Sequence, residues 1–197
     1  MSNSFKRIKN QTLFVGFPLA LISSFDNKYQ ENITPISSFF SLNNTIVFAI
    51  GKKSQCYENI KFSSNVIVNI PDFSSWEKVE KMAEIYYRFS KEESKNNDHF
   101  KKINDEFDKL GFTKLESPFQ GLSRIEECPI SIDLRIKKII PDNEFMLVTG
   151  DIYGVHVHQE LLDENDNIDS KKWEPLIYKL KEYTKTDPNP LGKHIAK

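Results

Sequence analysis

Hydrophobic and polar positions divide the chain into three regions that differ in period. The first third is rich in unbroken or β-branched apolar runs separated by turn residues, which is typical of strands. A turn at Asp26, Asn27 and Lys28 joins the first two runs and predicts a hairpin. The expected elements are strands over 18–24, 29–37, 45–50 and 65–70, and a short helix over 55–62.

The middle region changes to a helical period. Ser74 and Glu77 have the spacing of a capping box, and apolar residues then recur on one helical face. A polar stretch over 91–97 separates this helix from a second amphipathic helix, which Gly111 should end. The two apolar faces contain Trp76, Val79, Met82, Ala83, Tyr86 and Tyr87 in the first helix, and Phe100, Ile103, Phe107 and Leu110 in the second.

The last third returns to strands. Residues 130–140 and 145–158 predict a long hairpin around a turn at 141–143, with bulges or bends at Gly150 and Gly154. A short turn or helix is expected at 161–162, a surface loop at 163–170 and an extended tail over about 184–197. Helices inserted into a run of antiparallel strands favour a mainly β, single-domain chain over 1–197, built as a closed barrel with a helical insertion at about 74–110.

Composition narrows the class of protein. With 27 Lys+Arg and 28 Asp+Glu the net charge is −1, which gives no general field for a nucleic acid backbone. Fifteen Phe, seven Tyr and two Trp provide enough aromatic mass for a core, so wholesale disorder is excluded. No apolar run approaches the ~18–20 residues that span a bilayer. Two cysteines alone make neither a disulfide framework nor a four-ligand zinc site, and we expect reduced thiols in the cytoplasm.

The residues between the third strand and the short helix have the chemistry of an anion site. Lys52, Lys53 and Ser54 precede a helix start, where backbone N–H groups are free, and such a cluster suits a phosphate. An ordinary N-cap by Ser54 with two solvated lysines explains the same residues. The segment over 31–40 offers accessible backbone around Pro35 next to two phenylalanines, which could flank a flat heteroaromatic ring or simply end a strand.

His156 and His158 lie two apart on an expected strand, so both side chains should share one face. A metal site there needs further ligands that the sequence does not mark, and one surface histidine beside one hydrogen-bonded histidine is the other interpretation.

Taken in order along residues 12–180, these segments resemble the flavin-reductase-like family of the FMN-binding split barrel, which includes flavoredoxin-type proteins. The matching segments include residues 18–24, Asn32-x-x-Pro35-x-Ser37-x-Phe39, Lys53-Ser-x-x-Tyr-x-Asn-Ile, residues 125–129 and residues 148–156. Asn43-Asn44 stands where the family commonly has Pro-Pro, and Cys56 stands where a threonine is common.

The resemblance implies an antiparallel Greek-key split β-barrel that forms a homodimer with FMN at the subunit interface. Lys53, Ser54 and the backbone around Cys56 would receive the phosphate, and His156 would touch FMN or nicotinamide. The implied activity is NAD(P)H-dependent flavin reduction, with NADH or NADPH as donor and an oxygenase or another acceptor as partner; an FMN-carrying electron-transfer or storage protein is the alternative. The residues implied to line the ring and ribityl chain are Asn32, Thr34, Ser37, Ser38 and Phe39.

Overall fold

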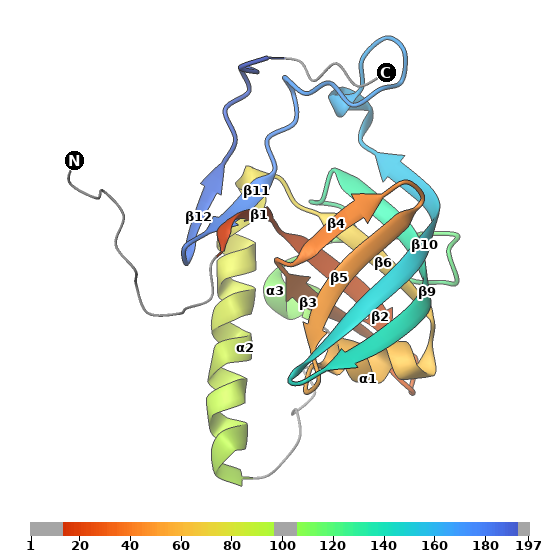
Figure 1. Ribbon diagram of the computed structural model, residues 1–197, viewed down its shortest axis with the longest axis vertical. Coiled ribbons are helices and arrows are strands. Elements are labelled where there is room, and N and C mark those ends of the chain that lie inside the picture. The colour runs from red at the N-terminus through yellow and green to blue at the C-terminus, as the bar shows by residue number, and fades with distance from the viewer. Residues whose placement is uncertain (1–13, 97–105, 193–197) are drawn as a thin grey trace, which may run out of the picture.

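The central feature is a seven-stranded sheet, seen in a computed structural model that describes residues 14–96 and 106–192. In chain order its strands are β2 (Ala20–Phe25), β3 (Glu31–Ile36), β4 (Phe39–Leu42), β5 (Thr45–Gly51), β6 (Asn65–Ile70), β9 (Ile130–Asp142) and β10 (Phe145–Val157). Every pairing is antiparallel, and the spatial order is β3-β2-β6-β9-β10-β5-β4 (Figure 1). These strands confirm the mainly β fold class and the hairpin of β2 with β3.

The sheet curls into a barrel that stays open between its two edge strands, β3 and β4. These edges follow one another in the chain and are not hydrogen-bonded to each other in the sheet. The expectation of a closed barrel is wrong here, and the split barrel is confirmed. Pro35 lacks the N–H that a partner strand would need. The free N–H and C=O of Ile33 bond instead to the side chains of Glu106 and Tyr86.

Two smaller sheets flank the barrel. One pairs β1 (Val15–Pro18), β11 (Leu176–Lys179) and β12 (Glu182–Lys185), and the other pairs β7 (Lys114–Leu115) with β8 (Arg124–Ile125). The hairpin of β11 and β12 corrects the expectation of an extended tail from about residue 184, because β12 includes Thr184 and Lys185. The last residues of the expected tail lie outside the described part of the chain.

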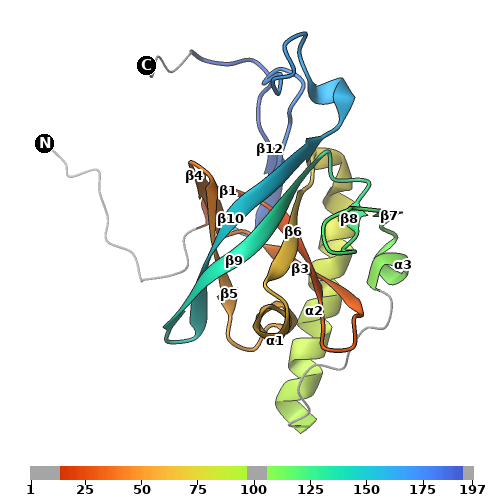
Figure 2. The ribbon, with the colours of Figure 1, turned by 90° about the vertical axis from the view of Figure 1, so that its right-hand side faces the viewer.

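The part of the chain that the structure describes also contains three helices: α1 (Gln55–Phe62), α2 (Trp76–Asn96) and α3 (Glu106–Leu110). Helix α1 lies across one end of the barrel and α2 runs beside it (Figure 2). Single 3-10 turns occur at η1 (Phe73–Ser75) and η2 (Gln159–Leu161). None of the described helices is long and apolar enough to cross a membrane.

The start of α2 differs from the expected capping box. Asp72, not Ser74, is the capping residue: its Oδ1 accepts from the Ser74 N–H at 2.9 Å and from the Ser74 hydroxyl at 2.6 Å. Glu77 is then an ordinary acidic residue in the first turn of α2. The end of α3 is as expected, since Gly111 follows it with a φ of +74°. Phe100, Ile103 and the side chain of Tyr87 lie outside the described residues.

The long hairpin of β9 and β10 confirms both expected irregularities. Its register shifts between Thr149 and Gly150 and again between Ile152 and Gly154. At Gly150 the strands approach so closely that a Cβ would lie 2.7 Å from Leu134 Cγ. A side chain at position 150 would therefore push the two strands apart.

Two hydrophobic cores hold these layers together. The first fills the barrel and includes Ile22, Phe48, Val66, Leu134 and Val148. The second lies between the outer face of β2–β3 and the helices α2 and α3. Because strand residues alternate in direction, neighbouring residues of β2 supply both cores. The second core contains Leu19, Leu21, Ile33, Val79, Met82, Phe107, Leu110, Phe112, Ile125, Cys128 and Leu176.

Candidate functional site

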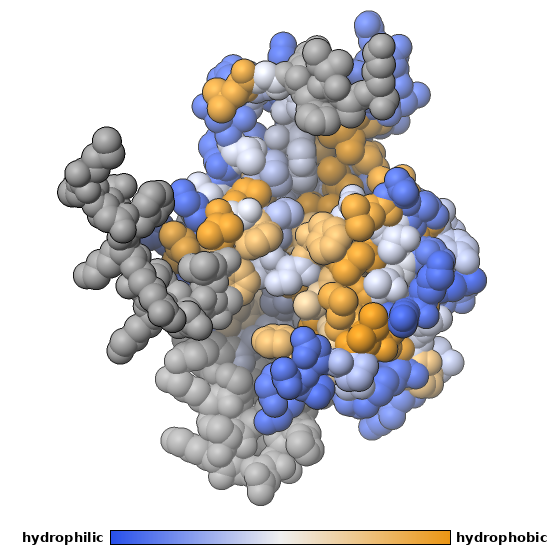
Figure 3. Space-filling model, in the orientation of Figure 1, coloured by the Kyte–Doolittle hydropathy of each residue, from blue (hydrophilic) through white to orange (hydrophobic). Residues whose placement is uncertain are grey.

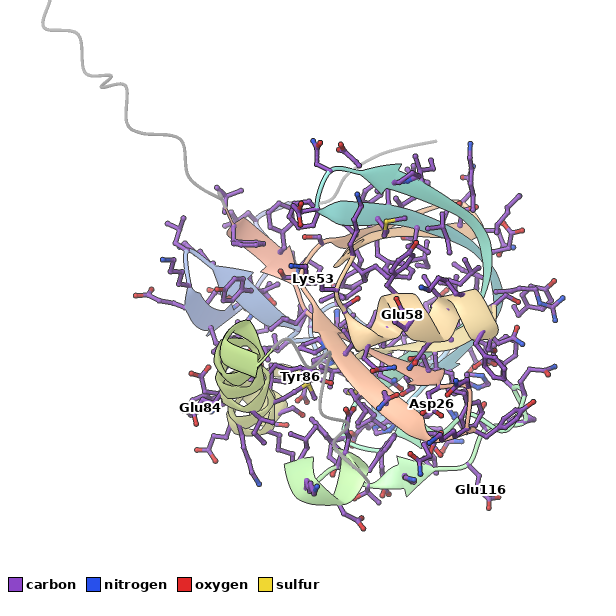
Figure 4. All side chains as sticks on the ribbon, turned by 90° about the horizontal axis from the view of Figure 1, so that it is seen from below. Asp26, Lys53, Glu58, Glu84, Tyr86 and Glu116 are labelled. Atoms are coloured by element: carbon purple, nitrogen blue, oxygen red, sulfur yellow. The ribbon has the colours of Figure 1, made fainter. Side chains whose placement is uncertain are left out.

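A cavity of about 380 Å³ opens where the edge strand β3 meets the β5–α1 connection and helix α2. Its size lies within the range of small-molecule sites. Figure 4 looks onto this side of the molecule, with Lys53 and Tyr86 labelled. The lining residues are Thr34, Pro35, Gly51, Lys52, Lys53, Ser54, Gln55, Tyr86 and Glu144.

One wall of the cavity is the amino end of α1. Ser54 is the N-cap of this helix, and its hydroxyl accepts from the Tyr57 N–H at 3.2 Å and donates to the Gly51 carbonyl at 2.8 Å. The structural interpretation of Ser54 as a cap is therefore correct. The capping role is compatible with an anion site, because the first N–H groups of a helix have no carbonyl within that helix to bond to.

The charges around the cavity favour an anion. Lys52 and Lys53 are exposed on its rim, and the opposing charge in the lining is the carboxylate of Glu144. Two ammonium groups against one carboxylate leave one positive charge beside the helix dipole. The expected lysines and the expected cap are thus brought to one place.

The opposite wall is the end of β3. Thr34 is 8 % exposed, and its buried Oγ1 makes no hydrogen bond of standard geometry. Its polar neighbour is the Tyr86 hydroxyl, with which it interacts by a hydrogen bond outside that geometry. Ser37 and Ser38 form the short connection that follows, and Phe39 begins β4 with its ring half-buried against the barrel core.

Two of the expected cofactor contacts lie behind the cavity wall. Asn32 is 1 % exposed and Cys56 is 0 % exposed, so neither side chain lines the cavity. The Asn32 Oδ1 accepts from Asn59 Nδ2 at 2.9 Å. Burial raises the pKa of the Cys56 thiol to about 12, which keeps it a neutral core residue. Cys56 lies in the first turn of α1, so the part of this residue suited to an anion is its backbone N–H.

His156 is held elsewhere. Its Nε2 lies 2.8 Å from Oδ2 of the buried Asp133, and the cavity residue Glu144 precedes the other end of β10. The twelve residues from 144 to 156 correspond to roughly 40 Å of strand. Within one subunit His156 is therefore remote from the cavity.

The two histidines expected on one strand do not both lie in a strand, since only His156 belongs to β10. His158 lies beyond β10, where it precedes η2, and its Nδ1 is 3.8 Å from a Glu160 oxygen. Across residues 14–96 and 106–192, no three His, Cys, Asp or Glu side chains are grouped so that they could hold a metal ion.

Tyr86 lines the cavity and Glu106 lies behind it, and neither could be found as such from the sequence pattern. Tyr86 lines the cavity, and its hydroxyl donates to the Ile33 carbonyl and lies 3.3 Å from Glu106 Oε1. In the sequence Tyr86 fits the apolar stripe of a helix, and Glu106 is one of many carboxylates in a polar region. Only the fold, which brings α3 against β3, joins the two.

The fold and the cavity define a split-barrel protein with a cavity beside the start of helix α1. A model of the flavin reductase like domain matches residues 14–187. The chain is 30 % identical to protein YdfE of Bacillus subtilis (strain 168), over 98 % of this chain and 92 % of that protein.

Two solved structures have the same fold. The flavoredoxin of Desulfovibrio vulgaris (Miyazaki F) has a TM-score of 0.75 at 19 % identity and covers 98 % of this chain and 96 % of its own. Component B of nitrilotriacetate monooxygenase from Bacillus cereus has a TM-score of 0.74 at 19 % identity and covers 99 % and 100 %. The chain belongs to the flavin-reductase-like family, and its function is flavin-related.

Proposed function

We propose that this protein binds FMN in the cavity between β3 and α1 and acts as an NAD(P)H-dependent flavin reductase. The observation that carries the proposal is the cavity itself. It combines a helix amino terminus and two lysines at one wall with the hydroxyl groups of Thr34 and Tyr86 at the other. A phosphate suits the first wall, and a ring edge with hydrogen-bonding groups suits the second.

Different residues of the cavity would contact the phosphate and the ring of FMN. Lys53, the Ser54 cap and the N–H groups of the first turn of α1 would hold the phosphate. Thr34 and the Ser37–Ser38 connection would bond the ring and ribityl chain, and Phe39 would contribute apolar surface. When bound, the flavin supplies the two-electron chemistry, and the protein's task is to hold the ring and exclude water. A separate acid–base pair is not needed for hydride transfer.

A second copy of the chain is the proposed cover for an apolar face of the sheet. Figure 3 shows hydrophobic residues gathered over β4, β5 and β10. Phe40 and Leu42 project from β4, and Phe145 and Leu147 from the adjoining β10 hairpin, with Phe145 59 % exposed. Apolar side chains grouped in this way are typical of an interface. A homodimer built on this face also agrees with the resemblance to the family.

The proposed reductase needs an acceptor for the reduced flavin that it produces. The fold neighbour from Bacillus cereus is a component of a monooxygenase, so an oxygenase that takes reduced flavin is the partner we propose. We place the protein in the cytoplasm, where reduced nicotinamide is available and where its buried free thiols, Cys56 and Cys128, would stay reduced.

An FMN-carrying electron-transfer protein, as in flavoredoxin, is the second candidate. It needs no nicotinamide contact, and His156, the expected contact to FMN or nicotinamide, is remote from the cavity within one subunit. The same cavity serves both functions, so the two differ in whether bound FMN accepts hydride from NADH or NADPH.

Binding is tested by titration of the protein with FMN and with riboflavin, followed by flavin fluorescence. We expect FMN to bind at least tenfold more tightly than riboflavin, a difference of about 1.4 kcal/mol. Lys53→Ala should reduce that ratio, and Lys171→Ala, an exposed lysine in a remote loop, should not. Equal affinity for FMN and riboflavin would contradict the phosphate site.

Turnover is tested by mixing FMN-loaded protein with NADH or NADPH in a stopped-flow instrument. Bleaching of the flavin absorbance faster than in free FMN supports the reductase. Bleaching at the rate of free FMN assigns the protein to the electron-transfer class.

A further inference from the structure

A chain of hydrogen bonds, buried at its centre and part-buried at its ends, starts at one wall of the cavity and ends at the other. The Tyr86 hydroxyl, on the α2 wall, shares its one proton between the Ile33 carbonyl and Glu106 Oε1, which lies 3.3 Å away. The same carboxylate oxygen accepts from Asn32 Nδ2 at 3.3 Å. Asn59 Nδ2 donates to Asn32 Oδ1 at 2.9 Å, and Gln55 Nε2, on the α1 wall, donates to Asn59 Oδ1 at 2.8 Å. Polar groups behind the cavity are therefore connected to both of its walls.

Glu106 is the ionisable centre of this chain. It is 3 % exposed, and its Oε2 accepts from the Ile33 N–H at 2.5 Å. Burial is the main cause that raises the pKa of its carboxyl to about 7, against the hydrogen bonds from Ile33, Asn32 and Tyr86. The unpaired edge of β3 needs only one acceptor for the Ile33 N–H and one donor for the Ile33 carbonyl. Neutral side chains could supply both. A buried carboxyl beside a ligand cavity is instead typical of a functional group.

The charged and titratable groups that face Glu106 come from each element packed against it. Helix α2 contributes the Tyr86 hydroxyl, whose pKa is raised well above its usual value by burial and by the Glu106 charge. Helix α3 contributes the Lys109 ammonium, which acts through space. Helix α1 contributes the neutral Cys56 thiol, which acts on Tyr86. Lys53, which precedes α1, lies on the cavity rim.

We propose that Glu106, acting through Tyr86, is a positioning residue that takes up a proton when an anionic ligand enters the cavity, so that the flavin phosphate and the proton bind together. This inference rests on the proposed FMN site and extends it to the groups behind its wall. The neutral carboxyl keeps the β3 edge bonded at Ile33 without placing a negative charge behind the ligand.

The coupling follows from linkage. An anion in the cavity disfavours the ionised form of a nearby carboxyl, so it raises the pKa of that carboxyl, and protonation of the carboxyl strengthens anion binding by the same factor. Above the pKa of Glu106 in the free protein, the dissociation constant of the ligand should rise by up to about tenfold per pH unit. The phosphate contributes little to this slope, because its second pKa is near 6 and it is a dianion throughout that range.

The test compares FMN dissociation constants between about pH 7 and about pH 8.5 for wild type, Glu106→Gln, Tyr86→Phe and the control Glu116→Gln. Glu116 is an exposed carboxylate that points away from the molecule (Figure 4). Wild type and the control should weaken about tenfold over this range, and Glu106→Gln should change less than about twofold. In Tyr86→Phe the weakening should begin at higher pH, because the lost hydrogen bond had lowered the pKa of Glu106.

Two direct readouts keep the proposal falsifiable if the Gln variant fails to fold. Calorimetry of FMN binding in buffers of different ionisation enthalpy should show uptake of up to one proton near pH 8. Carbon-13 NMR of the Glu106 carboxyl should show a midpoint near pH 7 that moves upward when FMN is added.

The outcomes separate this proposal from the proposed function. If no variant binds FMN at any pH, the FMN site itself is wrong, and the coupling fails with it. If wild type binds FMN with an affinity as independent of pH as that of Glu106→Gln, or without proton uptake, the coupling is overturned and the FMN site stands. A purely structural role for Glu106 would weaken binding equally at every pH.

Discussion

Replacing Glu106 by Gln should change how the free energy of unfolding depends on pH. The folded protein holds the proton of Glu106 more tightly than the unfolded chain does, because burial raises its pKa from 4.5 to about 7. The folded state therefore binds more protons than the unfolded state between these values, and wild-type stability should fall as the pH rises through this window. At about 1.36 kcal/mol per pKa unit, the loss is about 3 kcal/mol.

The assay is urea unfolding of wild type, Glu106→Gln and the exposed control Glu116→Gln, each at about pH 4.5 and about pH 8. The stability of Glu106→Gln relative to wild type should increase by about 3 kcal/mol from the lower to the higher pH. The control should follow wild type. A difference between Glu106→Gln and wild type that is the same at both pH values would refute the assignment of a perturbed, buried carboxyl.

Three further substitutions test the fold, the helix start and the interface. Gly150→Ala should destabilise the protein by about 1–3 kcal/mol in urea unfolding, because its Cβ would lie 2.7 Å from Leu134 Cγ, whereas Gly192→Ala, in open space, should be neutral. Ser54→Asp should preserve the helix cap and change the free energy of unfolding by no more than about 0.5 kcal/mol. The same substitution should weaken FMN binding more than about tenfold, because the new carboxylate repels the phosphate. Unchanged FMN binding would place the phosphate elsewhere. Leu147→Asp should convert a dimer to a monomer in sedimentation velocity, and Leu191→Asp, fully exposed, should leave the dimer intact.

The strands and helices that depend on local patterns were predictable. The alternation within β5 and the Ser54 cap of α1 are local signals, and both elements have the expected positions. The hairpin of β11 and β12 was not predicted, because its strands are short and charged and β11 is stabilised by pairing with β1, which is more than 150 residues earlier in the chain. Such distant pairing leaves no local pattern.

The site was predictable in part for the same reason. Lys53 and Ser54 are marked by their place before a helix, and they do line the cavity. Asn32 was assigned a direct contact with the ring, yet its side chain is enclosed by Asn59 and Glu106. Glu106 lies 74 residues from Asn32, and only the packing of α3 on β3 makes them neighbours.

The most direct measurement is a crystal structure of the protein grown with FMN. We predict that the phosphate lies within hydrogen-bond distance of the first-turn N–H groups of α1 and of Lys53, with the ring against Thr34 and the Ser37–Phe39 segment. Density for FMN at any other place, with the cavity between β3 and α1 filled only by water, would contradict it.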